Sequence, residues 1–174
     1  MQTKPTLIKC IFDSSQEVTK WIVSQDPSAF NKGPVGKWDT SQHLDHLTKT
    51  ATLTTRGLKM PKLLLRWKFG KTNRPLRNKQ EIIDRYQERL KNLPSGKTFS
   101  GSAGVSSTDK SATLTQYEES ILTLNTIIEK RWNEKALDKH LLPHPLMGRM
   151  PIRELLIWLD YHHYHHLEVL KDRY

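Results

Sequence analysis

Apolar side chains recur at steps of three and four along most of the chain, the spacing that places them on one face of an α-helix. The clearest stretches cover residues 14–25, 40–59, 115–132 and 151–172, and a shorter amphipathic stretch covers 78–92. No run convincingly shows the alternation that is typical of a strand. The pattern predicts an all-α fold, a four-helix bundle with one extra short helix.

Turn-forming and cap-forming residues mark the ends of these stretches. Asp26-Pro27 ends the first stretch, Asp39 or Thr40 can cap the second, and Pro151 suits the first turn of the last. Residues 94–113 are rich in Ser, Gly and Thr, which predicts a long loop. The length of 174 residues fits one domain covering residues 1–174.

The cysteine count and the apolar runs bear on the protein's compartment. Cys10 is the single cysteine, so an intrachain disulfide is excluded, and we expect it to be a small buried hydrophobic residue. The first residues contain no apolar run resembling a signal peptide, and no window has the roughly 18 apolar residues of a membrane span. We therefore expect a soluble, cytoplasmic protein with no membrane partner.

The last helical stretch carries histidines on its core face. That face is Ile152, Leu155, Leu159, His162, His166 and Val169. His162 and His166 are four residues apart, so their imidazoles can point at one site between helices. Imidazole suits zinc, nickel, copper or iron, and a third histidine from a facing helix would leave a coordination position open. The alternative is a pair of hydrogen-bonded core histidines, or a tract that binds metal only adventitiously.

Four short segments together resemble a known family. WDTSQHLDHL at residues 38–47 looks like the start of the second helix in the DinB-like (DinB/YfiT-like) superfamily of metal-dependent enzymes. HPLMGRM at 144–150, followed by RELL at 153–156 and YHHYHHL at 161–167, is similar to that family's closing connector and its His-x3-His helix. The resemblance covers the second helix and the last third of the chain.

The resemblance implies a metal site and a class of chemistry. In the family, one histidine of the second helix and the His-x3-His pair hold a divalent metal, usually nickel or zinc; here these are His46, His162 and His166. His43, His163 and His165 do not match ligand positions, although His43 is an alternative to His46. Some family members are thiol S-transferases that use bacillithiol or mycothiol, so the implied partner is a small-molecule substrate such as a low-molecular-weight thiol. Hydrolysis is the other chemistry that such a metal supports.

A basic stretch lies outside these motifs. The chain has 28 Lys and Arg against 18 Asp and Glu, a formal charge of +10, and residues 59–79 contain eight basic residues and no acid. The simplest interpretation is a solvated basic loop. One alternative is a site for substrate carboxylates. Another is a surface for nucleic acid or anionic membrane that uses Trp67 and Phe69, with nucleic acid the less favoured partner.

The remaining candidates are weaker. His144 is expected to be a connector residue, or else a group near the metal. Asp45, Glu118 and Glu119 are the carboxylates considered as a general base, but no spacing directs them at the metal. Trp21 or Trp158 could pair two copies of the chain in a homodimer.

Overall fold

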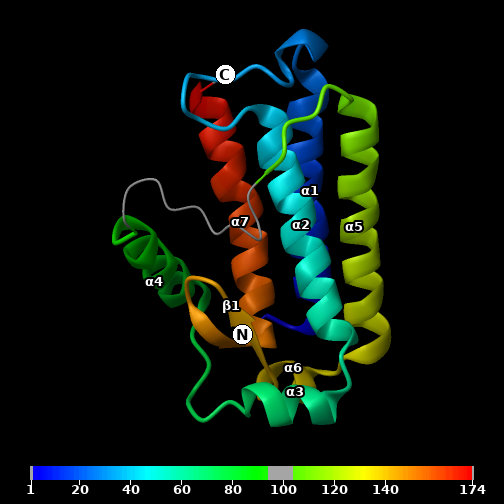
Figure 1. The fold of residues 1–174 in the computed structure, drawn as a ribbon. Coiled ribbons are helices and arrows are strands. Elements are labelled where there is room, and N and C mark those ends of the chain that lie inside the picture. Colours follow the sequence, from blue (N-terminus) through cyan, green and yellow to red (C-terminus); the bar gives the residue numbers. More distant parts are fainter. Residues whose placement is uncertain (1, 94–103, 174) are drawn as a thin grey trace.

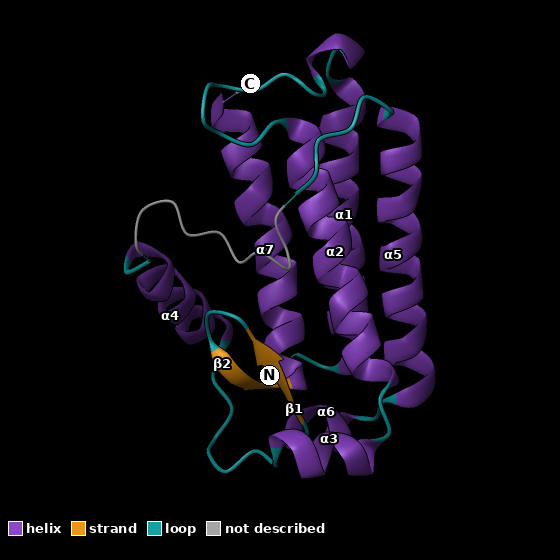
Figure 2. Ribbon diagram, viewed as in Figure 1, coloured by secondary structure: helices purple, strands orange, loops and turns teal. Residues whose placement is uncertain are grey.

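The computed structural model describes residues 2–93 and 104–173, and they are mostly helical. The elements in chain order are α1 (Lys4–Ser24), the short 3-10 helix η1 (Pro27–Ala29), α2 (Thr40–Lys59), α3 (Lys62–Phe69), α4 (Lys79–Lys91), α5 (Lys110–Arg131), α6 (Glu134–Lys139), β1 (Leu141–His144), β2 (Gly148–Pro151) and α7 (Ile152–Arg173). Figure 1 shows α1, α2, α5 and α7 as four long helices side by side, with α3 and α6 across one end. The predicted four-helix bundle is confirmed, and the β1–β2 hairpin in Figure 2 is a small addition to it.

Helix α2 follows the sequence prediction closely. Asp39 caps it, because its carboxylate accepts the backbone N–H of Gln42 at 2.8 Å while the Gln42 side chain accepts the backbone N–H of Asp39 at 2.9 Å. The apolar stripe predicted for this helix is fully buried: Leu44, Leu47, Ala51 and Leu58. This stripe fixes the rotation of α2, and so it fixes the direction in which the histidines of α2 point.

Two helices begin earlier than the sequence analysis predicts. Helix α1 starts ten residues before residue 14, because Thr3 caps it and Pro5 occupies its first turn. Helix α5 starts at Lys110, inside the predicted loop 94–113, because the Asp109 side chain accepts the backbone N–H of Ala112 at 2.8 Å. Residues 94–103 of that loop lie outside the described residues.

The connector before α7 is an ordered hairpin. Strands β1 and β2 pair antiparallel with His144 opposite Gly148, whose φ of +74° suits a residue without Cβ. The hairpin packs closely on α2 at Gly57. If this residue had a Cβ atom, the atom would lie only 2.8 Å from a methyl carbon of Leu142 in β1. The hairpin therefore sits close to the bundle, beside the first turns of α7.

The basic stretch is not a solvated loop. Residues 62–69 form α3, and the following segment is tied to α7 by ion pairs with buried carboxylates. Arg74 donates two hydrogen bonds to Glu154, at 2.6 and 2.7 Å, the Arg77 backbone N–H donates a third at 2.8 Å, and Lys79 pairs with Asp160 at 2.8 Å. A buried carboxylate without partners is costly, so these contacts anchor the start of α4 beside α7.

Two further expectations concern the surface. Trp158 is only 5% exposed and packs inside the chain, so it is not available to pair two copies, whereas Trp21 is half-buried against the core. In the part of the chain that the structure describes, every helix is too short or too polar to cross a membrane.

Candidate metal centre

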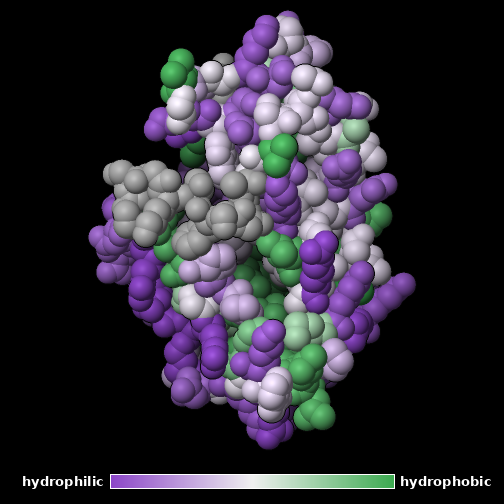
Figure 3. Space-filling model, viewed as in Figure 1, coloured by the Kyte–Doolittle hydropathy of each residue, from purple (hydrophilic) through white to green (hydrophobic). Residues whose placement is uncertain are grey.

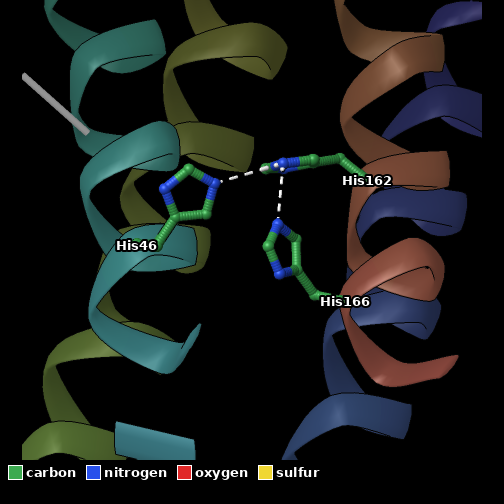
Figure 4. Close-up of side chains that lie close together, drawn as sticks. All are labelled: His46, His162 and His166. Atoms are coloured by element: carbon green, nitrogen blue, oxygen red, sulfur yellow. Dashed lines mark hydrogen bonds between the residues drawn. The ribbon is translucent and has the colours of Figure 1, made fainter. Parts of the chain in front are cut away.

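Three histidines from two helices converge at one point. His46 extends from α2, and His162 and His166 extend from α7 toward it (Figure 4). The Nε2 atom of His162 lies 3.2 Å from that of His46 and 3.1 Å from that of His166. His162 and His166 are buried, and His46 is half-buried. The group therefore combines one residue at the edge of the bundle with two residues inside it.

The spacing of these nitrogens fits a metal ion. Three imidazole nitrogens at about 2.0–2.1 Å from a tetrahedral ion would lie roughly 3.3 Å from one another. Ligand atoms of His46, His162 and His166 all lie within 4.8 Å of one another, and the two shortest separations are close to that value. The three residues could hold a metal ion with at least one coordination position left open.

The electrostatics of the group keep the ligand atoms available. Burial lowers the pKa of His162 and of His166 well below the ordinary value, and neighbouring histidines lower it further. Both rings are consequently neutral at pH 7, with a lone pair on one nitrogen. A cation would not have to displace protons from these two imidazoles at neutral pH.

His43 lies behind this group and outside it. Its Nδ1 atom is 2.8 Å from Nδ1 of His166, on the side of that ring opposite the converging Nε2. Burial, followed by the charge of Arg173, lowers the pKa of His43 to about 4, so its ring is neutral. The sequence analysis left His43 open as an alternative to His46, and the structure brings His46 into the group and sets His43 against His166.

Two tryptophans pack against the rings of these histidines. Trp38 lies 5.2 Å from the His46 ring and is stacked on the His166 ring at 6.5 Å, centroid to centroid. Trp158, one turn before His162, stacks on the His162 ring at 4.4 Å. This aromatic packing limits how far the rings can rotate. Trp38 was visible in the sequence only as part of the family motif, and its contact with the histidines was not predicted.

The other two histidines of the YHHYHH run take different positions. His163 lies in the core, where its Nδ1 is 2.9 Å from Oγ of Ser14 on α1, and burial lowers its pKa to about 3. His165 is half-buried and stacks on Tyr161. The structure places neither residue in the converging group, and His163 has the geometry of a core histidine.

His144 has the connector role expected of it and also borders the site. Its Nδ1 accepts the backbone N–H groups of Leu146 and Met147, both at 3.0 Å, which closes the hairpin turn. Its ring meets Trp158 edge to face at 4.2 Å. Burial lowers the pKa of His144 to about 4, so this ring is also neutral at pH 7.

None of the groups considered as a base or nucleophile borders the three histidines. Asp45 accepts the backbone N–H of Val105 and pairs with Lys49, both at 2.7 Å. Glu118 and Glu119 are exposed on α5. Cys10 is half-buried rather than buried, and burial raises the pKa of its thiol, which disfavours the thiolate.

A cavity of about 460 Å³ opens beside the histidines. His46, His162 and His166 belong to its wall, and the rest comes mainly from α2, α4, the hairpin and α7, together with Trp38 and with Phe69 of α3. Figure 3 shows hydrophobic residues gathered around a hollow on this face of the molecule. Sites for small molecules commonly have volumes of roughly 300–1,000 Å³, so the cavity is large enough for one.

The comparisons with known proteins bear on the fold alone. The sequence matches no protein-family model and no curated protein. Among solved structures the chain is similar to the crystal structure of TT2238, a four-helix bundle protein, with a TM-score of 0.61 and 16% identity. The match covers 98% of this chain and 99% of that one. The chain therefore shares the four-helix bundle fold over nearly its whole length.

Proposed function

We propose that this chain is a divalent-metal-binding bundle of the DinB-like type, with His46, His162 and His166 as ligands of zinc or nickel. The observation that carries the proposal is the convergence of three imidazole Nε2 atoms beside a cavity of small-molecule size. A purely structural metal has no need of such a cavity. The arrangement therefore favours a metal that acts on a bound molecule.

The proposed activity is activation of a thiol or of water for transfer to a substrate held in the cavity. A divalent cation on three neutral imidazoles keeps its full charge, and would lower the pKa of a thiol or water in its open position. Trp38 and Trp158 keep the ligand rings in place, and the apolar walls of the cavity reduce competition from water.

The activity can be tested with generic substrates. Zinc-loaded or nickel-loaded protein should accelerate transfer of an alkyl thiol to 1-chloro-2,4-dinitrobenzene, or hydrolysis of a 4-nitrophenyl ester. His162→Ala should abolish the acceleration, while His140→Gln, which changes a histidine outside the cavity, should retain it. Rates that neither a chelator nor His162→Ala reduces would contradict the proposal.

One observation favours a second candidate, a non-enzymatic bundle whose metal is structural and whose basic surface recruits a partner. On α3 the side chains of Leu63 and Trp67 are 79% and 81% exposed, beside the basic Arg66 and Lys68. Exposed aromatic and basic groups suit nucleic acid, whose binding weakens steeply with salt. Binding of single-stranded DNA that is lost at high salt and in Arg66→Ala with Lys68→Ala would support this candidate, and a flat response to salt would remove it.

A further inference from the structure

The wall of the cavity has an unusual composition for this protein. Lys, Arg, Asp and Glu make up 26% of the chain. Among the described residues that line the cavity none of these four types occurs, and most of the lining side chains are Leu, Pro, Met, Phe, Tyr or Trp. A ligand with several carboxylates would find no counter-charge in this wall, and transferring unpaired charge into such surroundings is costly.

Three basic groups of the stretch 59–79 are already engaged in ion pairs with α7. Arg74 and Arg77 pair with Glu154 of α7, and Lys79 pairs with Asp160 of the same helix. The wall includes no residue of this group. The positions of these three residues therefore do not favour binding of substrate carboxylates by the basic stretch 59–79.

The three converging histidines lie toward one end of the cavity, and other polar residues, Thr50, Thr54, His144 and His165, also line it. On α2 the lining positions run from His46 to Gly57, and on α7 they run from His166 back to Leu155. The two helices run in opposite directions (Figure 1), so the histidine ends coincide and the apolar ends coincide. Eleven residues at 1.5 Å each give a length of roughly 16 Å along the helix axes. The cavity is thus elongated, with the three histidines toward one end.

We propose that the cavity binds an uncharged, elongated and mainly apolar small molecule, with one polar head group directed at the three histidines. Among the described residues the wall offers apolar contacts along its length and no charged side chain, so it selects against polyanionic molecules. The direction of the head group rests on the proposed function, since it requires a metal at His46, His162 and His166. The apolar character of the ligand rests on the wall alone.

The first experiment uses metal-free protein, so that its result is independent of the metal. The neutral fluorescent probe N-phenyl-1-naphthylamine should bind saturably, and linear alcohols should displace it. Each added methylene should lower the displacing concentration roughly three- to fourfold, until the alcohol reaches the length of the cavity. Binding that is not saturable, or displacement that does not depend on chain length, would overturn the proposal.

Matched variants connect this binding to the cavity. Leu53 on α2 and Leu90 on α4 line the cavity at its exposed edge, and are 49% and 36% exposed, so a charge there leaves the folded core intact. Leu53→Glu and Leu90→Glu should each weaken probe binding tenfold or more. Leu122→Glu, at a 68% exposed position of α5 outside the cavity, should not change it. Equal binding by all three variants would place the probe elsewhere and overturn the proposal.

A second arm separates this inference from the proposed function. On zinc-loaded protein, hexanethiol should bind more tightly than hexanol, and more tightly than glutathione, which is charged and hydrophilic. Tighter binding of glutathione would overturn the apolar ligand class even if the metal is present. Probe binding that behaves as predicted in a protein unable to take up zinc would leave the apolar class standing while the metal proposal fails.

Discussion

The Nδ1 atoms of His43 and His166 lie 2.8 Å apart, which sets a second histidine of α2 directly against one of the proposed metal ligands. A hydrogen bond between two neutral imidazoles needs one N–H and one lone pair. When Nε2 of His166 uses its lone pair on a cation, Nδ1 of His166 must carry the hydrogen, and His43 then accepts it. His43 can therefore support the tautomer in which His166 binds a metal, by accepting the hydrogen of its Nδ1.

This relationship predicts a graded effect of substitutions at His43. His43→Leu removes the acceptor and should weaken zinc affinity by about 10- to 100-fold, the usual effect of losing a partner of a ligating histidine. His43→Asn offers a carbonyl oxygen in a similar place and should restore most of the affinity. Competition with a chromogenic chelator measures both values. Wild-type affinity in His43→Leu would show that the contact has no such role.

The ion pairs around Glu154 predict a large effect on stability from a residue outside the group of converging histidines. Arg74→Met leaves the fully buried Glu154 with fewer partners, so we expect a loss of about 2–4 kcal/mol in the free energy of unfolding. Arg89→Met, an exposed position on α4, serves as the control and should cost less than about 0.5 kcal/mol. Urea unfolding followed by circular dichroism compares the two variants, and equal midpoints would refute the anchoring role.

The effect of Arg74→Met should also depend on pH. Burial alone would raise the pKa of Glu154, but the hydrogen bonds from Arg74 and Arg77 and their charges outweigh it and lower the pKa. A carboxylate with a lowered folded-state pKa contributes stability above its unfolded pKa, and this contribution is lost as the pH falls through the folded value. The difference between wild type and Arg74→Met should therefore be complete at pH 7 and should shrink below about pH 4. A difference that stays constant in acid would point to a loss of packing instead.

The buried neutral histidines predict a different pH dependence for metal-free protein. Burial lowers the pKa of His163 to about 3, whereas an unfolded histidine titrates near 6.5. Between these values the unfolded chain takes up protons that the folded chain does not, so stability falls as the pH drops below about 6.5. His163→Leu should reduce the slope of the unfolding free energy against pH by roughly 1 kcal/mol per pH unit between pH 6 and 5. Urea unfolding at several pH values in the presence of a chelator measures this slope, and an unchanged slope would show that His163 is protonated in the folded state.

The fold could be predicted where the local signals were strong. Helix α2 has a capping box at Asp39 and a clean apolar stripe, and both its ends were predicted correctly. The start of α1 was missed because Ser14 and Ser15, which are buried on its core face, interrupt the apolar stripe that begins at Leu7 and Ile11. Helix α3 was not predicted because its eight residues include several basic side chains and look like a solvated segment. The segment after it is held by ion pairs to distant parts of the sequence, such as that of Arg74 with Glu154, which a local pattern does not indicate.

The site was predictable only in part. The spacing of His162 and His166 follows from helix geometry, and the choice of His46 came from a resemblance that neither the fold nor the similar solved structure tests. The position of His43 behind His166 depends on the distance between α2 and α7, which no periodicity encodes. The cavity depends on where α4 and the hairpin settle, and those positions are set by long-range contacts such as that of Arg74 with Glu154.

The central claim is that His46, His162 and His166 hold one divalent metal, and elemental analysis of protein purified without a histidine tag tests it most directly. Wild type and His140→Gln should contain close to one equivalent of zinc or nickel, and His46→Ala and His162→Ala should contain almost none. Wild-type protein that is metal-free and cannot be loaded with either metal at neutral pH would contradict the account.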